Sequence, residues 1–571
     1  MREKVIKKGH PKGLYLLFIT EMAERFSYYG MRGIFILYLM SALYDENAAY
    51  SIYGTYTGLA YLTPVLGGWI SDRYWGNRKS IIIGGILMAL GQFFMYGSAR
   101  FIKKSIHYER PMVIDPNVNN TFSNILLYVG LFLLIMGNGL FKPNISTMLG
   151  DLYEATDTRK DSAFTIFYMG INVGAFIAPF VCSTVSPKVN GYLNPGGYRW
   201  GFFCAGIGMI LSIIVFTLFK NKLLVTPDGL QVGLTPDKDQ VKARQKEQVE
   251  LLEKTLEQEN GKEGEEKNKL KKNSPIRLII NLVLAVVIFF LYMWLLAEDK
   301  EGEKNSKWKD FNEYISAIIY VCTISLPLFI ITDKNLNHTQ KSRIGVIYII
   351  ALFVIFFWAA YEQAGSSLTV FADQQIDRHI CDWNISICKW EFPAAWFQSV
   401  NPVTIVILAP ITALIWEFLG KRNLEPFSPA KQAIGLILLA IGYNVIAIGT
   451  QGVGDTDKVS YWWLVSLYVI HTVGELCLSP IGLSMVNKLS PAHLSSLLMG
   501  VWFMSNAASN VFSAKLAKFK PSKQKGIKNV LGFEIDTLTK FFSVFVIMGA
   551  LSGIILLGFC PLLKRMMKGI Q

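Results

Sequence analysis

The chain has 571 residues, of which 52% are hydrophobic and only 17% are charged. Soluble globular domains carry about 25% charged residues, so this composition excludes an ordinary soluble protein. Apolar runs of bilayer-spanning length recur from residue 14 to the C-terminus. The net charge of +14 does not require a nucleic-acid partner, because Lys and Arg gather in alternate loops, as the positive-inside rule expects.

The apolar segments come in three groups along the chain. The first six lie at 14–43, 51–75, 79–99, 121–149, 162–186 and 197–220. Two more lie at 275–297 and 313–333, and the last six lie at 343–371, 394–419, 431–451, 459–488, 493–518 and 538–564. We predict an all-α polytopic membrane protein with fourteen helices and both termini in the cytoplasm. No cleavable signal peptide is recognised.

Two six-span halves joined by a long cytoplasmic loop are the layout of the major facilitator fold. The predicted parts are an N-terminal six-helix bundle (1–220), a polar cytoplasmic linker (221–274), an extra helical pair (275–333) and a C-terminal six-helix bundle (334–571). The linker is dense in Lys, Glu and Gln and cannot bury a core of its own.

The first segment carries charges in the middle of an apolar run. Helical periodicity places Glu21, Glu24, Arg25 and Tyr28 on one face, with Tyr29 close beside them. Charges inside a membrane normally face a bundle interior or a water-filled cavity. We therefore expect an ion or substrate path here, and a structural ion pair that locks two helices together is the alternative.

The loop between the second and third segments contains Gly67-Gly68, Asp72-Arg73 and Arg78-Lys79. Glycines let two helices approach closely. The charged side chains can hold the helix ends together in one of the conformations between which two helix bundles alternate. The loop resembles the G-x-x-x-D-R-x-G-R-R signature of major facilitators. A simple cytoplasmic turn is the alternative interpretation.

Two further polar residues lie inside predicted spans of the first half. Lys142, next to Pro143, needs a carboxylate or a ligand anion unless it snorkels to an interface. Asn172 has an amide that can hold a charged ligand without adding charge, or can join two helices.

The second half contributes lone acids, Glu362 and Glu475, and the polar helix start at Asn401. The first half contributes the cations Arg25, Arg32 and Lys142. This distribution suits a zwitterion with a carboxylate and an amine. It also suits salt bridges between the halves that form in one state and break in another. Trp358 and Trp502 also lie in these spans, and for aromatics taken singly core packing is the better expectation.

Three motifs in order resemble the proton-coupled oligopeptide transporter family, a major-facilitator branch, in its bacterial form. They are Glu21-x-x-Glu24-Arg25-Phe-x-Tyr28-Tyr29-Gly30, Phe167-Tyr-x-x-Ile-Asn172-x-Gly174 and Gly474-Glu475-Leu-x-x-Ser479-Pro480. The resemblance implies symport of di- and tripeptides with protons, without any other cofactor. It implies that Gly54 stands where animal members have a histidine.

The resemblance also assigns roles to residues. It implies that Glu21, Glu24 and Arg25 couple transport to protons. It implies that Arg25, Tyr29 and Lys142 bind the peptide carboxylate, and that Asn172, Asn401 and Glu475 bind the amino group. Trp358 and Trp502 would line pockets for peptide side chains. The gating salt bridges are Arg32 with Glu362 and Lys142 with Glu475.

We expect a monomer in the bacterial cytoplasmic membrane, with the lipid bilayer and small peptides as its partners. An alternative is the same fold carrying another anionic or zwitterionic solute. An enzyme would need a nucleophile–base pair or a metal set, and none is recognised. Cys381 and Cys388 lie in a predicted external loop and are close enough in sequence for a disulfide.

Overall fold

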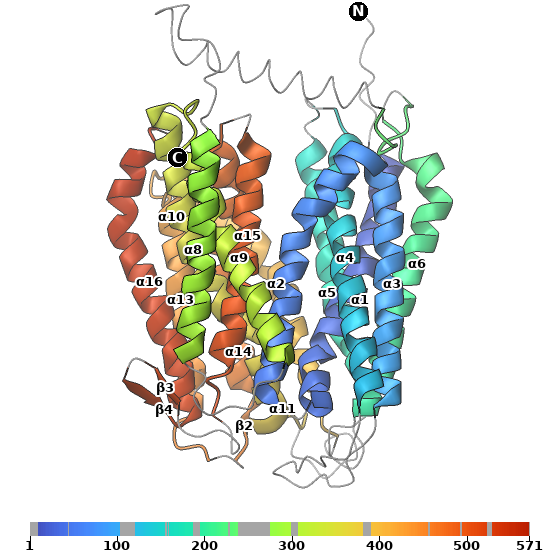
Figure 1. Ribbon diagram of the computed structural model, residues 1–571, viewed down its shortest axis with the longest axis vertical. Coiled ribbons are helices and arrows are strands. Elements are labelled where there is room, and N and C mark those ends of the chain that lie inside the picture. Colours follow the sequence, from blue (N-terminus) through green and yellow to red (C-terminus); the bar gives the residue numbers. More distant parts are fainter. Residues whose placement is uncertain are drawn as a thin grey trace, which may run out of the picture. The chain divides into compact units, whose positions relative to one another are not determined.

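The structure is a computed structural model of the whole chain, and its backbone is almost entirely helical (Figure 1). It describes residues 9–43, 45–102, 120–154, 157, 159–186, 195–226, 229–237, 275–298, 307–380, 390–454, 457–491, 494–521, 528–530 and 532–569. Cys381 and Cys388 therefore lie outside the described residues. The five other cysteines are free thiols.

The first half of the chain forms α1 (Lys12–Leu43), α2 (Glu46–Ile70), η1 (Ser71–Trp75), α3 (Gly76–Phe101), α4 (Thr121–Asp151), α5 (Arg159–Thr184), η2 (Pro195–Tyr198) and α6 (Arg199–Leu223). The rest forms α8 (Pro275–Glu298), α9 (Lys307–Ile331), α10 (His338–Tyr361), η4 (Glu362–Gly365), α11 (Ser367–Gln375), η5 (Ala394–Ser399), α12 (Val400–Lys421), α13 (Ser428–Gly449), α14 (Tyr461–Leu489), α15 (Ser495–Ala517) and α16 (Leu538–Met566).

Eleven helical stretches among the described residues are long and apolar enough to cross a membrane. One of them runs without interruption from Glu46 to Phe101, where the sequence predicts two spans, and α1 and α15 are not among the eleven. The multi-pass helical fold is confirmed, whereas the count of fourteen spans stays a prediction.

The chain divides into two compact units. Unit 1 comprises residues 1–42, 63–108 and 113–241, and unit 2 comprises residues 43–62, 109–112 and 242–571. The extra pair α8 and α9 thus belongs with the C-terminal helices. Helix α2 is shared, because its first part groups with unit 2 and its last part with unit 1.

The connection between α2 and α3 is the five-residue π-helical turn η1, which ends at Gly76 with φ +71°. A Cβ atom at Gly76 would lie 2.3 Å from the carbonyl oxygen of Leu234, so only glycine fits. Arg78 is buried and donates to the carbonyl oxygens of Leu224, at 2.6 Å, and Val232, at 2.5 Å. The start of the predicted linker therefore packs on the signature loop of unit 1.

Inside unit 1, α2 crosses α4 at two glycines. A Cβ atom on Gly67 would lie 1.9 Å from the carbonyl oxygen of Gly139, which leaves no room for any side chain. Thr63 adds a hydrogen bond from its hydroxyl to the carbonyl oxygen of Ile135, 3.1 Å long. This close approach fixes the part of α4 that carries Lys142.

The predicted segment at 343–371 is not one helix. Helix α10 ends at Tyr361, and η4 and a backbone break at Ser366 precede α11. Hydroxyl groups support the break: Ser367 donates to the side-chain oxygen of Gln363 at 2.5 Å, and Thr369 donates to the carbonyl oxygen of Ala364 at 2.6 Å. Serine and threonine compete with helical hydrogen bonds in this way.

Among the described residues of unit 2, four short strands lie between helices. Strand β1 (Ile376–Asp377) pairs in parallel with β2 (Val459–Ser460), with Ile376 opposite Val459. Strand β3 (Lys528–Val530) pairs antiparallel with β4 (Phe533–Ile535), with Asn529 opposite Glu534. They tie loops together without changing the all-helical architecture.

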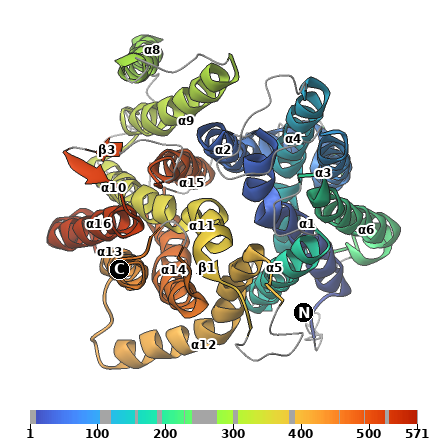
Figure 2. The same ribbon diagram turned by 90° about the horizontal axis from the view of Figure 1, so that it is seen from below.

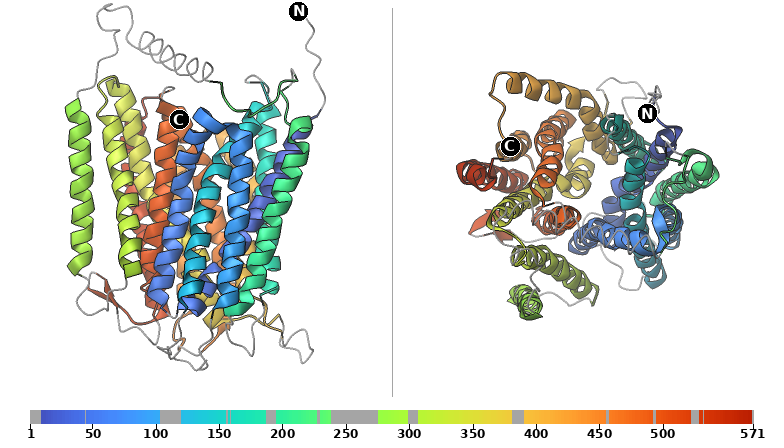
Figure 3. Two further views of the ribbon diagram at one scale, coloured as in Figure 1. Left: turned by 45° about the vertical axis from the view of Figure 1, so that its right-hand side comes forward. Right: turned by 90° about the horizontal axis from the view of Figure 1, so that it is seen from above.

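The extra pair packs on α15 through α9, with α8 outermost in unit 2 (Figures 2 and 3). A buried charge cluster marks this contact. Glu313 of α9 lies 3.5 Å from Lys515 and 3.6 Å from Lys518, and accepts a hydrogen bond from Tyr292 of α8 at 3.1 Å. The Lys515 ammonium donates in turn to the Tyr292 hydroxyl. This Glu313 cluster joins all three helices.

Replacing Glu313 by glutamine should destabilise the protein by roughly 1–3 kcal/mol, because two lysines then lose the carboxylate that compensates their desolvation. The thermal unfolding midpoint of the purified protein is the measurement. Glu417→Gln is the matched control, since the ion pair of Glu417 with Lys421 is exposed on the surface of α12 and exposed pairs contribute little. Equal midpoints for the two variants would contradict the role of the cluster.

Candidate functional site

The charged motif of α1 forms a compact ionic cluster in unit 1. Glu21, Glu24 and Arg25 are 3%, 0% and 5% exposed. The Arg25 Nε atom lies 2.9 Å from a Glu21 carboxylate oxygen and 2.5 Å from a Glu24 carboxylate oxygen. Two carboxylates thus share one guanidinium, and one of the two negative charges has no counter-charge within this triad.

Helix α5 packs on α1 at this cluster through small residues. A Cβ atom on Gly174 would lie 2.4 Å from the carbonyl oxygen of Met22 and 3.0 Å from the Cβ of Arg25. Gly170 meets Phe18 in the same way, one turn earlier. The spacing of these glycines is the pattern that brings two membrane helices into backbone contact, and here it holds Arg25 in place.

Two tyrosines extend the cluster along α1. The Arg25 guanidinium lies 5.6 Å from the ring centre of Tyr28, and the Tyr28 and Tyr29 rings meet edge to face at 5.2 Å. The guanidinium of Arg32 lies 5.9 Å from the ring centre of Tyr29. Cations over aromatic faces are stabilised by the ring quadrupole, so this face of α1 alternates cations and aromatic rings.

Lys142 of α4 and Asn172 of α5 are the other predicted site residues of unit 1. Lys142 is half-buried and close enough to both Glu21 and Glu24 for an electrostatic interaction. A second cation therefore faces the carboxylate pair. Asn172 is buried, and its amide nitrogen donates to the Tyr168 carbonyl oxygen of its own helix at 2.9 Å.

The second polar cluster lies in unit 2 around Glu475 of α14. One Glu475 carboxylate oxygen accepts hydrogen bonds from the Tyr361 hydroxyl, at 2.5 Å, and from the Asn401 amide, at 2.9 Å. The Asn401 amide nitrogen also lies 2.5 Å from the Tyr361 hydroxyl and 3.0 Å from the Thr472 hydroxyl. Helices α10, α12 and α14 thus converge on one carboxylate.

Tyr361 and Thr472 are functional candidates that the sequence did not single out. Tyr361 is next to Glu362 and one helical turn after Trp358, two residues that the sequence did single out. This position was the signal that could have identified Tyr361. Tyr361 is the last residue of α10, and its hydroxyl donates to Glu475 of α14. The His471 Nε2–H donates to the Leu439 carbonyl oxygen, 3.2 Å away, which makes it an interior histidine with a structural partner.

Three more predicted residues lie in unit 2. Glu362 is buried at the start of η4, close enough to Glu475 to interact with it electrostatically. Trp358 packs edge to face on Tyr361, with ring centres 5.1 Å apart. Trp502 is 4% exposed and its indole lies against Gly482, where a Cβ atom would be 2.3 Å away. Its surroundings are those of a packed aromatic residue.

The structure thus groups the predicted residues into two sets. Unit 1 holds Glu21, Glu24, Arg25, Tyr29, Arg32, Lys142 and Asn172, and unit 2 holds Trp358, Glu362, Asn401, Glu475 and Trp502. The predicted salt bridges Arg32–Glu362 and Lys142–Glu475 each join residues of different units, and they stay predictions.

A polytopic helical protein with buried ionic clusters and no soluble domain among its described residues has the organisation of a membrane transporter. A family model described as "PTR2: POT family" matches residues 78–223 and 264–531. The chain belongs to the POT family, and its fold is that of the major facilitators.

Curated relatives match almost the full length of the chain. A protein named "Di-/tripeptide transporter" from Lactococcus lactis subsp. cremoris is 30% identical over 98% of this chain and 97% of the relative. "Uncharacterized transporter YclF" from Bacillus subtilis (strain 168) is 32% identical over 98% of this chain and 96% of the relative.

Solved structures agree with this assignment. A structure described as a peptide transporter POT in complex with sulfate is 30% identical, covers 99% of this chain and 97% of that chain, and has a TM-score of 0.71. A POT family transporter in complex with a thioalcohol conjugated peptide is 28% identical, with 98% of both chains covered and a TM-score of 0.70.

Proposed function

We propose that the protein is a proton-coupled symporter that imports di- and tripeptides by alternating access. Its membership of the POT family and the names of its relatives support the substrate class. The observation that carries the proposal is the buried cluster of Glu21, Glu24 and Arg25. A site that shares one guanidinium between two carboxylates, in the middle of an apolar helix, can bind and release a proton.

The unit 1 cluster supplies the proton site and a cationic site. Protonation of one carboxylate removes a negative charge beside Arg25, so the guanidinium becomes available to a peptide carboxylate. Lys142, close to the same two acids, can take part in that exchange. Tyr29 is placed to complete the carboxylate site, and Asn172 is proposed to assist at the amino end.

The unit 2 cluster supplies the amine site. A carboxylate held by Tyr361 and Asn401 is oriented before the ligand arrives, and a charge-assisted hydrogen bond to an ammonium group is stronger than a neutral one. Trp358 lies against Tyr361 and is placed to contact a peptide side chain. Trp502 is proposed for a second side-chain pocket.

Two salt bridges are proposed to alternate during the cycle. Arg32 with Glu362 would hold one side closed, and Lys142 with Glu475 would couple the two units. Each pair joins a cation of unit 1 to an acid of unit 2. Breaking such pairs on substrate binding is a recognised way to drive a rigid-body rearrangement. We place the protein as a monomer in the bacterial cytoplasmic membrane, with both termini in the cytoplasm.

A second candidate substrate class is another small zwitterion. One POT family transporter, 28% identical to this chain, is described in complex with 5-aminolevulinic acid, which carries an amine and a carboxylate like a peptide. The unit 1 and unit 2 clusters would recognise both peptides and other small zwitterions. Competition for uptake is therefore needed to distinguish the two substrate classes.

The test is uptake of a labelled dipeptide into proteoliposomes with an inward proton gradient. We expect accumulation that stops when a protonophore collapses the gradient. Unlabelled di- and tripeptides should compete, whereas N-acetylated dipeptide and 5-aminolevulinic acid should compete weakly. Uptake that is unchanged when the gradient collapses would contradict proton coupling. Strong competition by 5-aminolevulinic acid alone would favour small zwitterions other than peptides as the substrate class.

A further inference from the structure

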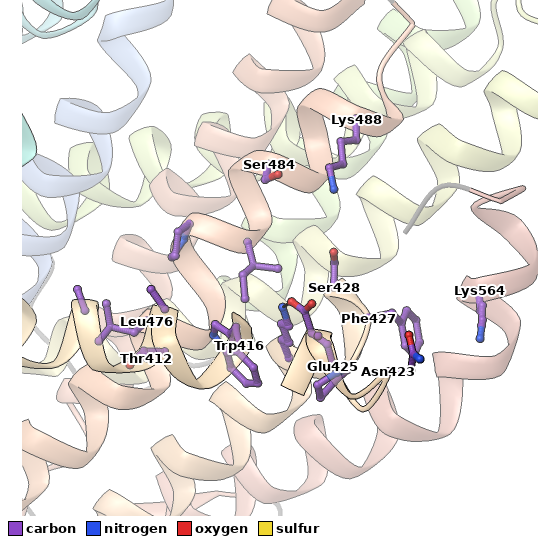
Figure 4. A pocket seen from close by; sticks show the side chains of 17 residues that line it. Thr412, Trp416, Asn423, Glu425, Phe427, Ser428, Leu476, Ser484, Lys488 and Lys564 are labelled. Atoms are coloured by element: carbon purple, nitrogen blue, oxygen red, sulfur yellow. Dashed lines mark hydrogen bonds and ion pairs between the residues drawn. The ribbon is translucent and has the colours of Figure 1, made fainter. Parts of the chain in front are cut away.

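A cavity of about 910 Å³ lies in unit 2, and none of the residues of the Glu475 cluster lines it (Figure 4). It is bounded by α12, the loop that leads into α13, the last turns of α14, and Lys564 of α16. These helix ends meet where the sequence predicts the cytoplasmic face. A cavity of this size accommodates a ligand as large as a drug or a lipid headgroup with part of its chains.

The lining changes from apolar to cationic along α14, from Leu476 and Ile481 to Ser484 and Lys488. On α12 it passes from the small residues Ala409 and Ala413 to Trp416. In Figure 4, Leu476 and Thr412 lie at one side of the view, and Lys488 and Lys564 lie toward the other.

The surroundings of the cavity are apolar and open. Leu414, Ile415 and Phe418 on α12, and Leu483 on α14, are exposed large hydrophobic residues next to lining positions. In a membrane protein such surface faces lipid chains. The cavity therefore adjoins an exposed apolar surface of unit 2 and has a polar end formed by the helix termini.

The charges at the polar end favour an anion. Three lysines line the cavity, Lys431, Lys488 and Lys564, against one acid, Glu425. Lys431 is 8% exposed, forms an ion pair with Glu425 and lies 4.6 Å from the ring centre of Trp416. The lining therefore carries a net positive charge, with three lysines against one acid.

Trp416 provides an independent sign of a ligand. Its indole Nε1 is buried and donates to no acceptor in the described part of the chain. Buried donors of this kind normally have a partner. Trp416 lies between the apolar and the cationic parts of the lining, where tryptophan commonly sits at the level of lipid headgroups.

We propose that this cavity binds an anionic membrane lipid, with its phosphate group near Lys488 and Lys564 and its acyl chains along the Ala413 and Leu476 side. Basic pockets between transmembrane helices at the cytoplasmic face bind anionic headgroups. A free phosphate ion would use the lysines but not the apolar lining, so the lining favours the lipid. The occupant would contact α14 at Leu476, directly after Glu475, and so could influence the substrate cluster.

The test measures lipid binding to the purified full-length protein by native mass spectrometry and thermal shift. The probes are short-chain phosphatidylglycerol, phosphatidylcholine with the same chains, and inorganic phosphate. We expect selective retention of phosphatidylglycerol. The double variant Lys488→Gln/Lys564→Gln should weaken it about tenfold or more, because each surface cation contributes on the order of 1 kcal/mol to anionic-lipid binding.

The matched control is Lys421→Gln/Arg422→Gln, which removes two cations from the same loop region that do not line the cavity. It should change phosphatidylglycerol binding by less than about twofold. Trp416→Phe should weaken binding while leaving the net charge unchanged. Equal retention of both lipids, equal losses in the two double variants, or a lysine-dependent shift with inorganic phosphate alone would overturn the proposal.

Discussion

Glu24→Gln is expected to abolish uptake driven by the proton gradient while leaving peptide counterflow in place. Glutamine keeps the shape of the side chain and fits the same fully buried position, but it cannot bind or release a proton. The initial rate of gradient-driven uptake should fall by about a hundredfold, as for other groups whose proton exchange is essential. Exchange of labelled for unlabelled peptide across the same membrane needs no net proton movement, and it should retain a substantial rate.

Glu21→Gln is the informative companion variant. Both carboxylates contact the same Arg25 nitrogen, so either variant leaves one acid with one guanidinium. If a single site carries the proton, one variant will lose gradient-driven uptake and the other will keep it. If the pair titrates as a unit, both will lose it. If gradient-driven uptake survives in both variants, the proton site does not lie on these two carboxylates of α1.

The α1 cluster was predictable from sequence because its geometry is local. Residues three and four apart share a helix face, so Glu21, Glu24 and Arg25 had to meet once the segment was helical. The distances of 2.9 and 2.5 Å confirm this contact. The family assignment followed from the same motif together with two others, and the family match confirms it.

The surroundings of these motifs were not predictable in the same way. The hydroxyl of Tyr361, at the end of α10, donates to Glu475 of α14, more than a hundred residues further along the chain. Directly after α10, the Gln363 side chain accepts from Ser367 and donates to Ser513 of α15. Such contacts between distant parts of the chain leave no periodic pattern in the sequence.

The sequence also predicted residues 221–274 to be a polar linker that cannot bury a core of its own. The first part of this segment supplies acceptors to Arg78, whose guanidinium needs several of them once it is buried. Composition could not reveal this, since the acceptors are two backbone carbonyl groups and the side-chain amides of Asn221 and Gln231, none of which stands out in a polar segment. Likewise, nothing in the composition indicates that the first part of α2 belongs to the same unit as α15. In that unit the backbone of Gly54 lies so close to Ala514 that a Cβ atom on Gly54 would clash with it.

Glu475→Gln is the second substitution with a large expected effect. Glutamine keeps the volume of the side chain and can still accept from Tyr361 and Asn401, so folding should be preserved. What is lost is the negative charge that would hold the peptide ammonium group. Hydrogen bonds to charged groups contribute roughly 1.5–3 kcal/mol, so the KM for a dipeptide should rise about 10- to 100-fold.

Peptide analogues separate this role from a role in the Lys142–Glu475 salt bridge. The wild-type protein should prefer a free dipeptide to its N-acetylated form, and Glu475→Gln should lose most of that preference. Tyr361→Phe, which removes one hydrogen bond but keeps the charge, should raise KM less and retain the preference. Glu417→Gln, an exposed acid on α12, should change neither value. A fall in maximal rate at unchanged KM, with the preference intact, would instead assign Glu475 to coupling the two units rather than to the amine site.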